Sequence, residues 1–263
     1  MRSDGLPYPA ESDDLTHQRN MMRMPGAVLM TRLQVYNTHS PDGQISGTPH
    51  VHLACTEMYV VSNGRGAVEM IDKAGFSRVE LKQHDALLFS PGTIHRLINP
   101  DGNLEILVIM QNSGLPERGD NVVCFTEEWL SSDSAYAEAM KVHTLQDAYR
   151  RRDLAVEGFF ALKAAYEAGQ ERGQEALRCF YELAKERTAP YHAEWQDMIQ
   201  QGAVREAQKS LNHVSKLQKG DLSHLFESEY VKIRGAESSL GFCGHLNRYC
   251  DPASLLPEGI RES

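Results

Sequence analysis

The chain has 263 residues and a mass of 29.5 kDa, and 41% of its residues are hydrophobic, which is enough to fill a sizeable core in one large domain or two small ones. Its 27 Lys and Arg residues against 36 Asp and Glu residues give a formal net charge of −9. A chain of this charge has no general attraction for phosphate backbones, so we expect no nucleic-acid partner.

Residues 1–20 are polar, include Pro7 and Pro9, and contain no apolar run of the length that a signal peptide or membrane span requires. We expect a flexible N-terminal tail, no membrane association and a cytoplasmic protein. The cysteines agree with a reducing compartment, because they are odd in number and widely spaced. We expect ordinary packing for all five, which are Cys55, Cys124, Cys179, Cys243 and Cys250.

Residues 21–126 have the pattern of an antiparallel sandwich or barrel. Short apolar runs are separated by Gly, Pro, Asn and Asp clusters, and they predict strands near residues 27–36, 57–62, 67–71, 86–89 and 104–110. The dipeptides Asp42-Gly43, Asn63-Gly64 and Asp101-Gly102 tolerate positive φ and suit tight connections between strands.

Residues 127–263 are predicted to form a helical extension with an irregular C-terminal tail. N-capping side chains stand at residues 131–134, and helical periodicity predicts helices near 154–168, 175–186, 191–201 and 204–217. From about Asp221 onward, glycines and Pro252 interrupt every pattern. The domain organisation expected is therefore a tail (1–20), a β-barrel (21–126) and this extension (127–263).

Two features of the helical region are interpreted as structural. The aromatic residues recur at helical spacing and are expected to form core rather than a cofactor site; they are Phe159, Phe160, Tyr166, Phe180, Tyr181 and Trp195. The run Arg150-Arg151-Arg152 is interpreted as a solvated face or a helix end.

Candidate metal ligands concentrate in two short stretches. His50 and His52 alternate on a predicted strand, so both side chains can face the interior, and Glu57 returns to it after a short bend. A Pro91-Gly92 turn then delivers His95 at the start of an apolar strand. Imidazole nitrogens and a carboxylate are ligands that a borderline divalent metal prefers.

These two stretches resemble the paired signatures of the cupin superfamily, a histidine pair followed by Glu57 and Gly64, and then a Pro-Gly turn followed by His95 and Asn99. The resemblance covers roughly residues 27–112 and implies a small antiparallel barrel (double-stranded β-helix or jelly roll). It also implies one divalent metal held by His50, His52, Glu57 and His95. The sequence departs from the usual pattern at His84, where the second signature usually has Gly, at Ser90, where Pro is usual, and at Gly43 and Gly47, whose spacing before His50 is unusual. His84 is interpreted as a loop residue.

The metal predicts an enzyme without naming its reaction, because this scaffold carries many chemistries. Four protein ligands on an octahedral ion leave two positions for substrate or dioxygen, so the first expectation is a dioxygenase acting on a small oxygen-bearing molecule. A metal-dependent isomerase or lyase acting on a sugar or organic acid, with Tyr59 as a weak candidate for the base, is the alternative enzyme. A sensor that binds a small ligand without chemistry is the third.

Strand alternation turns Tyr59 and Val61 inward after Glu57, and Phe89 and Leu97 flank the His95 turn. These four side chains are expected to line the pocket beside the metal or to pack as barrel core. The ligand set accepts Fe, Mn, Ni, Co, Cu or Zn, with iron as the first expectation. The helical region is expected either to cap the mouth of the barrel or to build a homodimer, since cupin-like proteins commonly pair through their sheets and an exposed sheet edge invites such pairing.

Overall fold

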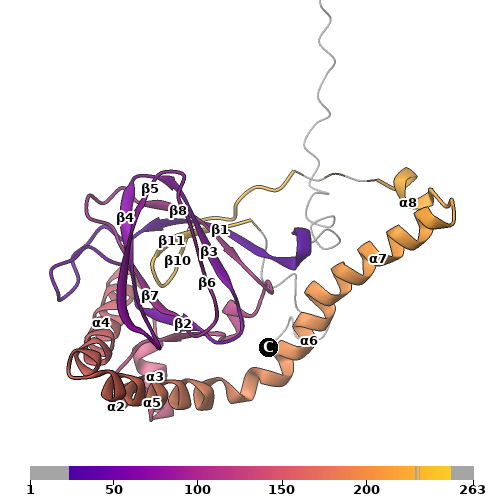
Figure 1. Ribbon diagram of the computed structural model, residues 1–263. Helices are drawn as coiled ribbons and strands as arrows, with labels where there is room; N and C mark the ends of the chain where they lie inside the picture. Colours follow the sequence, from indigo (N-terminus) through magenta and orange to yellow (C-terminus); the bar gives the residue numbers. More distant parts are fainter. Residues whose placement is uncertain (1–23, 229, 231, 250–263) are drawn as a thin grey trace, which may run out of the picture.

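The computed structural model describes residues 24–228, 230 and 232–249, and it consists of two antiparallel β-sheets with helices on one side (Figure 1). The tail predicted over residues 1–20 and the segment 250–263 with Cys250 lie outside the described residues. The fold class expected from the sequence, antiparallel β-structure followed by a helical region, is confirmed.

The first sheet has six strands in the order β10-β11-β1-β8-β3-β6, all paired antiparallel. Buried residues alternate with partly exposed ones along its strands, because one face of this sheet is in the core. Its strands are β1 (Leu29–Val35), β3 (Glu57–Asn63), β6 (Ala86–Phe89), β8 (Glu105–Met110), β10 (Ser239–Leu240) and β11 (Gly244–Arg248).

The second sheet has five strands in the order β5-β4-β7-β2-β9. Every residue of β7 and β2 is buried, because this sheet has the first sheet on one face and helices on the other. Its strands are β2 (His50–His52), β4 (Arg65–Asp72), β5 (Gly75–Lys82), β7 (Ile94–Ile98) and β9 (Asn121–Val123).

The tight turns lie where the dipeptides predicted them. Gly64 joins β3 to β4 with a φ of 76°, and a Cβ at this position would lie 2.5 Å from the Asn103 carbonyl oxygen. His84 lies exposed in the turn between β5 and β6 with a φ of 75°. It thus adopts a left-handed backbone conformation. Glycine, the usual residue at this point of the cupin signature, adopts this conformation more easily.

Helices occupy most of the chain after the second sheet. The longest one starts at a capping box, in which the Thr144 hydroxyl accepts from the Asp147 amide while the Asp147 carboxylate accepts from the Thr144 amide. The α-helices are α2 (Glu127–Leu130), α3 (Asp133–Met140), α4 (Leu145–Glu167), α5 (Gln170–Thr188), α6 (His192–Ile199), α7 (Arg205–Gln218) and α8 (Ser223–Phe226). Short helical turns are η1 (Pro25–Ala27), η2 (Pro116–Arg118), η3 (Ala189–Tyr191) and the π-helical η4 (Gln200–Val204).

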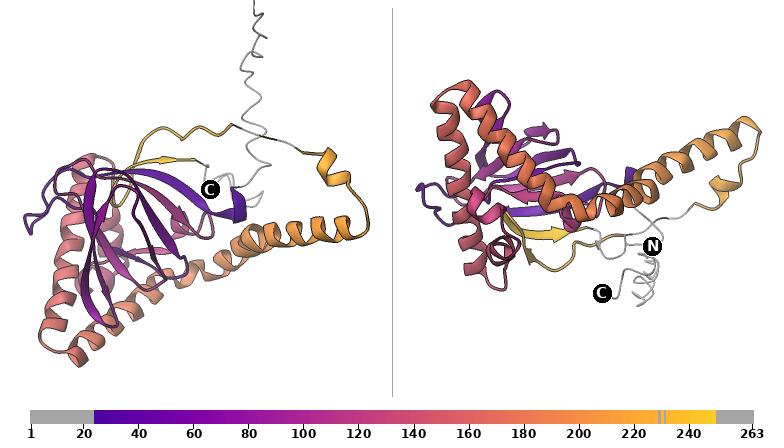
Figure 2. Two further views of the ribbon diagram at one scale, coloured as in Figure 1. Left: turned by 45° about the horizontal axis from the view of Figure 1, so that its top comes forward. Right: turned by 90° about the horizontal axis from the view of Figure 1, so that it is seen from below.

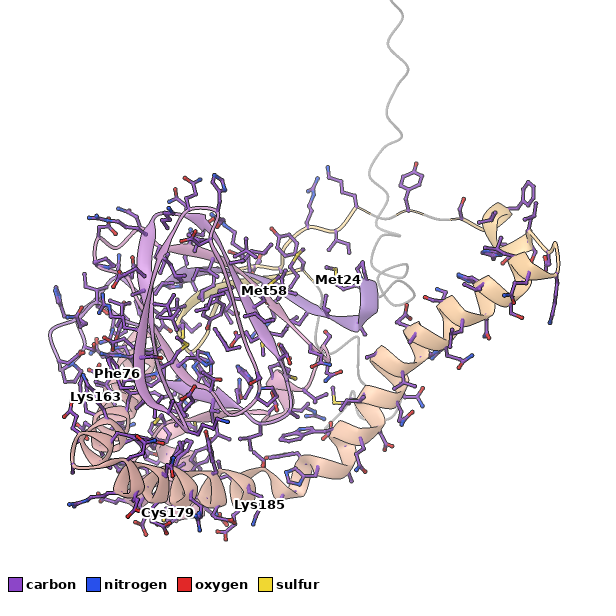
Figure 3. The ribbon with its side chains drawn as sticks, in the orientation of Figure 1. Met24, Met58, Phe76, Lys163, Cys179 and Lys185 are labelled. Atoms are coloured by element: carbon purple, nitrogen blue, oxygen red, sulfur yellow. The ribbon has the colours of Figure 1, made fainter. Side chains whose placement is uncertain are left out.

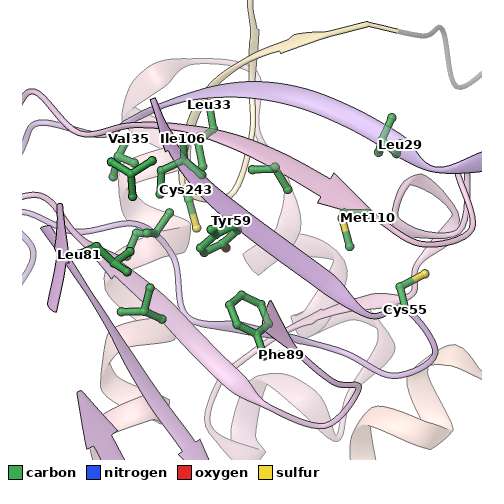
Figure 4. Packing of buried hydrophobic residues seen from close by; sticks show 14 of the residues in the cluster. Leu29, Leu33, Val35, Cys55, Tyr59, Leu81, Phe89, Ile106, Met110 and Cys243 are labelled. Carbon is green, nitrogen blue, oxygen red and sulfur yellow. The ribbon is translucent and has the colours of Figure 1, made fainter. Parts of the chain in front are cut away.

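Two hydrophobic cores hold these layers together. One lies between the sheets (Figure 4), and Trp195 of α6 belongs to it. The other lies between the second sheet and helices α4 and α5 (Figure 2), and it includes the fully buried Phe159. At its edge the Lys163 ammonium lies 4.0 Å from the centre of the Phe76 ring on β5 (Figure 3). The prediction that the helical aromatics pack as core is therefore confirmed for Phe159, Phe180 and Trp195.

Beyond the cores, α7 continues from α6 through η4 as an arm that leaves the body of the molecule (Figures 1 and 2). No helix among the described residues is long and apolar enough to cross a membrane.

The structure corrects two of the expectations for the second half of the chain. The segment after Asp221 is not irregular throughout, because β10 and β11 join the first sheet and β11 pairs with β1. The arginine run is a solvated face only at Arg150, which is exposed, whereas Arg151 and Arg152 are only 6% and 1% exposed. The Arg152 guanidinium donates to the carbonyl oxygens of Thr38 and His39, a loop more than a hundred residues away in the sequence.

Candidate metal centre

Three strands bring the four predicted ligands together. His50 and His52 lie on β2, Glu57 begins β3, and His95 on β7 is paired directly with His50 across the sheet. One potential ligand atom from each residue lies within 4.8 Å of all the others. All four side chains are buried, with exposures of 5%, 4%, 3% and 0% in chain order.

The outer nitrogen of each imidazole is held by an oxygen acceptor. His50 Nδ1 lies 2.9 Å from the Thr48 carbonyl oxygen, and His95 Nδ1 lies 2.9 Å from the Thr93 carbonyl oxygen. His52 Nδ1 lies 3.1 Å from Oδ2 of Asp120. Because these oxygens can only accept, each ring donates from Nδ1, and in its neutral form it carries the lone pair on Nε2. This is the tautomer that a metal ligand needs.

The inner atoms of the cluster have no hydrogen-bond partner. His52 Nε2, His95 Nε2 and Glu57 Oε2 are all buried and unpaired. Glu57 Oε2 lies 3.5 Å from the first nitrogen and 3.1 Å from the second. Three buried acceptors pointing at one place are costly unless a cation or proton lies between them. The residues therefore fit a divalent metal ion, both in donor type and in arrangement.

The charges around the cluster also favour a cation. Burial opposes ionisation of Glu57, yet the neighbouring His52 and His95 hold its pKa below the usual range. For His52 burial acts to lower the pKa, but the carboxylates of Glu57 and Asp120 outweigh it and raise the pKa. Burial, together with His95 and His52, holds the pKa of His50 well below its usual value, so that ring is neutral at pH 7. An anionic carboxylate beside a neutral imidazole is the protonation state required for metal binding.

A cavity of about 180 Å³ opens beside the cluster and is bordered by His50, His52 and Glu57. Apolar side chains from β1 and β8, including Leu33 and Val108, form much of its wall. This volume is below the roughly 300–1,000 Å³ of pockets for drug-sized ligands, so it suits a small molecule.

The predicted pocket residues divide into two groups. Tyr59 borders the cavity and lies with its ring centre 5.9 Å from that of His95. Val61, Phe89 and Leu97 lie in the hydrophobic core between the sheets, in which Phe89 is labelled in Figure 4. The centre of the Phe89 ring lies 4.4 Å from that of the His95 ring.

Four further residues around the site were not identified from the sequence. Asp120 is fully buried and accepts from the backbone amides of Leu53 and Ala54 as well as from the ring of His52. The other three are Glu117, Arg151 and Cys243, which border the cavity. They reach it from η2, α4 and the β10–β11 turn, so only the tertiary fold relates them to the two histidine stretches.

The protonation of two of these residues follows from burial. Burial raises the pKa of Glu117, although Arg248 lies 3.4 Å away and opposes the shift. Burial also raises the pKa of the Cys243 thiol to about 12, so it is neutral at pH 7.

Fold and site together define a class: an antiparallel two-sheet protein with a buried three-histidine, one-glutamate cluster opening onto a small cavity. Residues 38–110 match the family model described as the cupin domain. This chain therefore contains a cupin domain, as the sequence motifs predicted, and the match includes all four residues of the cluster.

Solved structures with similarity to this chain include a cupin protein from Bacteroides fragilis, at 20% identity, TM-score 0.24 and coverage of 32% of this chain and 63% of that one. A DMSP lyase from Ruegeria pomeroyi has 17% identity and TM-score 0.24, with coverage of 32% and 36%. A TDP-fucose-3,4-ketoisomerase from Campylobacter jejuni has 13% identity and TM-score 0.26, with coverage of 32% and 58%. This chain spans less than two thirds of each of them. No curated protein matches its sequence.

Proposed function

We propose that the protein is a metal-dependent enzyme acting on a small oxygen-bearing organic molecule, and that His50, His52, Glu57 and His95 hold the ion. The observation that supports this most strongly is the set of three buried, unpaired acceptor atoms, two of which belong to residues that border a cavity, His52 and Glu57. In a purely structural cluster these inner atoms would be hydrogen-bonded, whereas here Glu57 Oε2 lies 3.1 Å from His95 Nε2 and 3.5 Å from His52 Nε2 without a hydrogen bond.

The residues of this chain would prepare the site in three ways. The acceptors on the Nδ1 atoms fix the orientation of each imidazole. The apolar walls from β1 and β8 exclude water around the substrate. Burial raises the pKa of Tyr59 well above its usual value, so its hydroxyl stays protonated and can donate a hydrogen bond to a substrate oxygen. When bound, the ion would supply Lewis-acid polarisation of a substrate oxygen or activation of dioxygen.

Dioxygen chemistry is the first reaction to test. The protein, loaded anaerobically with iron(II), is mixed with small chelating acids and phenols in an oxygen-electrode cell, beside a His95→Ala variant treated identically. We expect oxygen uptake matched to substrate loss in the wild type and none in the variant. Metal-loaded protein that turns over none of these compounds, with or without oxygen, would contradict the enzyme proposal and favour a ligand-binding module.

A metal-dependent isomerase or lyase is the second candidate, and a particular residue favours it. Glu117 borders the cavity, one of its oxygens is buried and unpaired, and burial raises its pKa toward the range useful for proton transfer. Tyr59 is a weaker base, because its raised pKa keeps it protonated. Product formation under anaerobic conditions that is lost on Glu117→Gln would select this candidate.

Iron as the metal, a cytoplasmic location and a homodimer belong to the same proposal. Elemental analysis of the purified protein tests the first, and sedimentation equilibrium tests the last.

A further inference from the structure

The cavity beside the histidine cluster contains one charged side chain without an opposite charge. Its charged side chains, apart from the histidines, are Glu57, Glu117, Arg151 and Arg248. Glu117 and Arg248 pair with each other at 3.4 Å, and Glu57 faces two histidines. Among the described residues, no carboxylate lies within ion-pair distance of the Arg151 guanidinium.

Arg151 is nevertheless 94% buried, since only 6% of it is exposed. Its Nη2 donates to the Gly241 carbonyl oxygen at 2.7 Å, and its Nε is buried without a partner. A guanidinium carries five donors, so one bond leaves most of its hydrogen-bonding capacity unused. A buried charge in this condition is costly unless something else compensates it.

The hydrogen bond from Arg151 to the Gly241 carbonyl oxygen does not explain why this position has an arginine. The Gly241 carbonyl oxygen also accepts from the Tyr36 hydroxyl at 2.9 Å, so it would remain paired without the guanidinium. The guanidinium carbon lies 4.5 Å from the centre of the Phe242 ring. That ring in turn lies 5.2 Å from the His50 ring, which places the positive charge one aromatic side chain away from the candidate metal ligands.

We propose that Arg151 binds the carboxylate of the substrate, and hence that the substrate is a small organic acid. This inference rests on the proposed function and names its substrate class. The guanidinium is suited to a carboxylate because its planar fork of donors matches the two oxygens of that group. The ion and Arg151 both carry positive charge. An acid with a second oxygen-bearing group binds Arg151 through its carboxylate and the ion through the other oxygen. The cavity volume of about 180 Å³ restricts the acid to a few carbon atoms.

Isothermal titration calorimetry tests the inference with pyruvate and oxalate as probes and with pyruvamide and oxamide as neutral molecules of the same size. Inorganic phosphate is included as a different anion. Two variants remove the charge: Arg151→Gln keeps a donor for the Gly241 carbonyl, and Arg151→Met fills the space with apolar atoms. Arg150→Gln is the matched control, because it lies next along the same helix with a 44% exposed side chain.

We expect the wild type and Arg150→Gln to bind the acids more tightly than the amides, and both Arg151 variants to lose about 10- to 100-fold in acid affinity with little change for the amides. The unfolding midpoint of the Arg151 variants should be unchanged or higher, because removing an unpaired buried charge does not destabilise the fold. Either variant alone decides the matter if the other does not fold.

Several results would overturn the inference: equal affinity for acids and amides, tighter binding of phosphate than of either acid, unchanged acid affinity in a folded Arg151 variant, or loss of the fold in both variants. The metal content of each sample separates this inference from the proposed function. Metal-bearing protein without a preference for acids refutes the inference alone. Metal-free protein that still binds acids through Arg151 refutes the metal-dependent function and leaves the inference standing.

Discussion

Replacing Asp120 with asparagine should weaken metal binding, although none of the four candidate ligands is substituted. In the wild type, Asp120 Oδ1 accepts from the amides of Leu53 and Ala54 at 3.2 and 2.6 Å, while Oδ2 accepts from His52 Nδ1 at 3.1 Å. In Asp120→Asn, the amide oxygen must keep the two backbone donors, so the amide NH₂ faces His52 Nδ1. Two donors then oppose each other, and His52 has to move its proton to Nε2, the atom that would bind the ion.

The size of this effect follows from the bond that is lost. A hydrogen bond to a charged group contributes about 1.5–3 kcal/mol, which corresponds to a loss of about 10- to 100-fold in metal affinity. Zn²⁺ affinity is measured by competition with a fluorescent chelator, with far-UV circular dichroism to show that the variant is folded. Asp101→Asn is the control, because that carboxylate pairs with the exposed Arg65 side chain. Unchanged zinc affinity in a folded Asp120→Asn protein would refute this account of His52.

The remaining predictions concern stability and are checked by chemical or thermal unfolding. Burial opposes ionisation of Asp42, but the hydrogen bonds from Arg96 and Ser40 and the positive charge of Arg96 together outweigh it and lower the pKa of that carboxyl from its ordinary 3.8. Its contribution to stability is therefore present above about pH 4 and lost in more acidic solution. Asp42→Asn should destabilise the protein at pH 7 but cause a much smaller change at pH 3, and an equal change at both pH values would contradict this. Gly158→Ala should lower the unfolding midpoint despite the better helix propensity of alanine, because its Cβ would lie 2.2 Å from the Cys124 carbonyl oxygen; a higher midpoint would show that α4 can move away. Phe159→Ala should reduce the free energy of unfolding by about 3–5 kcal/mol. Far-UV circular dichroism and tryptophan fluorescence should show one shared unfolding transition at a lower midpoint; separate transitions would mean that the helices fold independently.

The parts of the site that the sequence predicted are those fixed by local geometry. His50 and His52 share a side of β2 because strand side chains alternate, and the Pro91-Gly92 turn, with Gly92 at a φ of 89°, positions His95. The strands and turns of the first region were predictable for the same reason. Each is determined by residues within a few positions of one another.

The parts that the sequence did not predict depend on distant contacts. Arg151 belongs to a run of three arginines and is buried only because the β10–β11 segment, some ninety residues later, covers it. That segment is itself short and glycine-rich, and its strands exist because β11 pairs with the edge of β1. Asp120 follows a glycine in a loop and contacts His52 across 68 positions of sequence. Periodicity and composition carry no information about such pairs.

If four buried side chains hold one metal ion, the metal content of the purified protein will show it. Inductively coupled plasma mass spectrometry is applied to the wild type and to a His50→Ala/His95→Ala variant, both purified identically and checked for folding by circular dichroism. We expect about one transition-metal ion per wild-type chain and essentially none in the folded variant. Wild-type protein that retains no metal even after anaerobic reconstitution with iron(II), or a variant that retains as much metal as the wild type, would contradict this expectation.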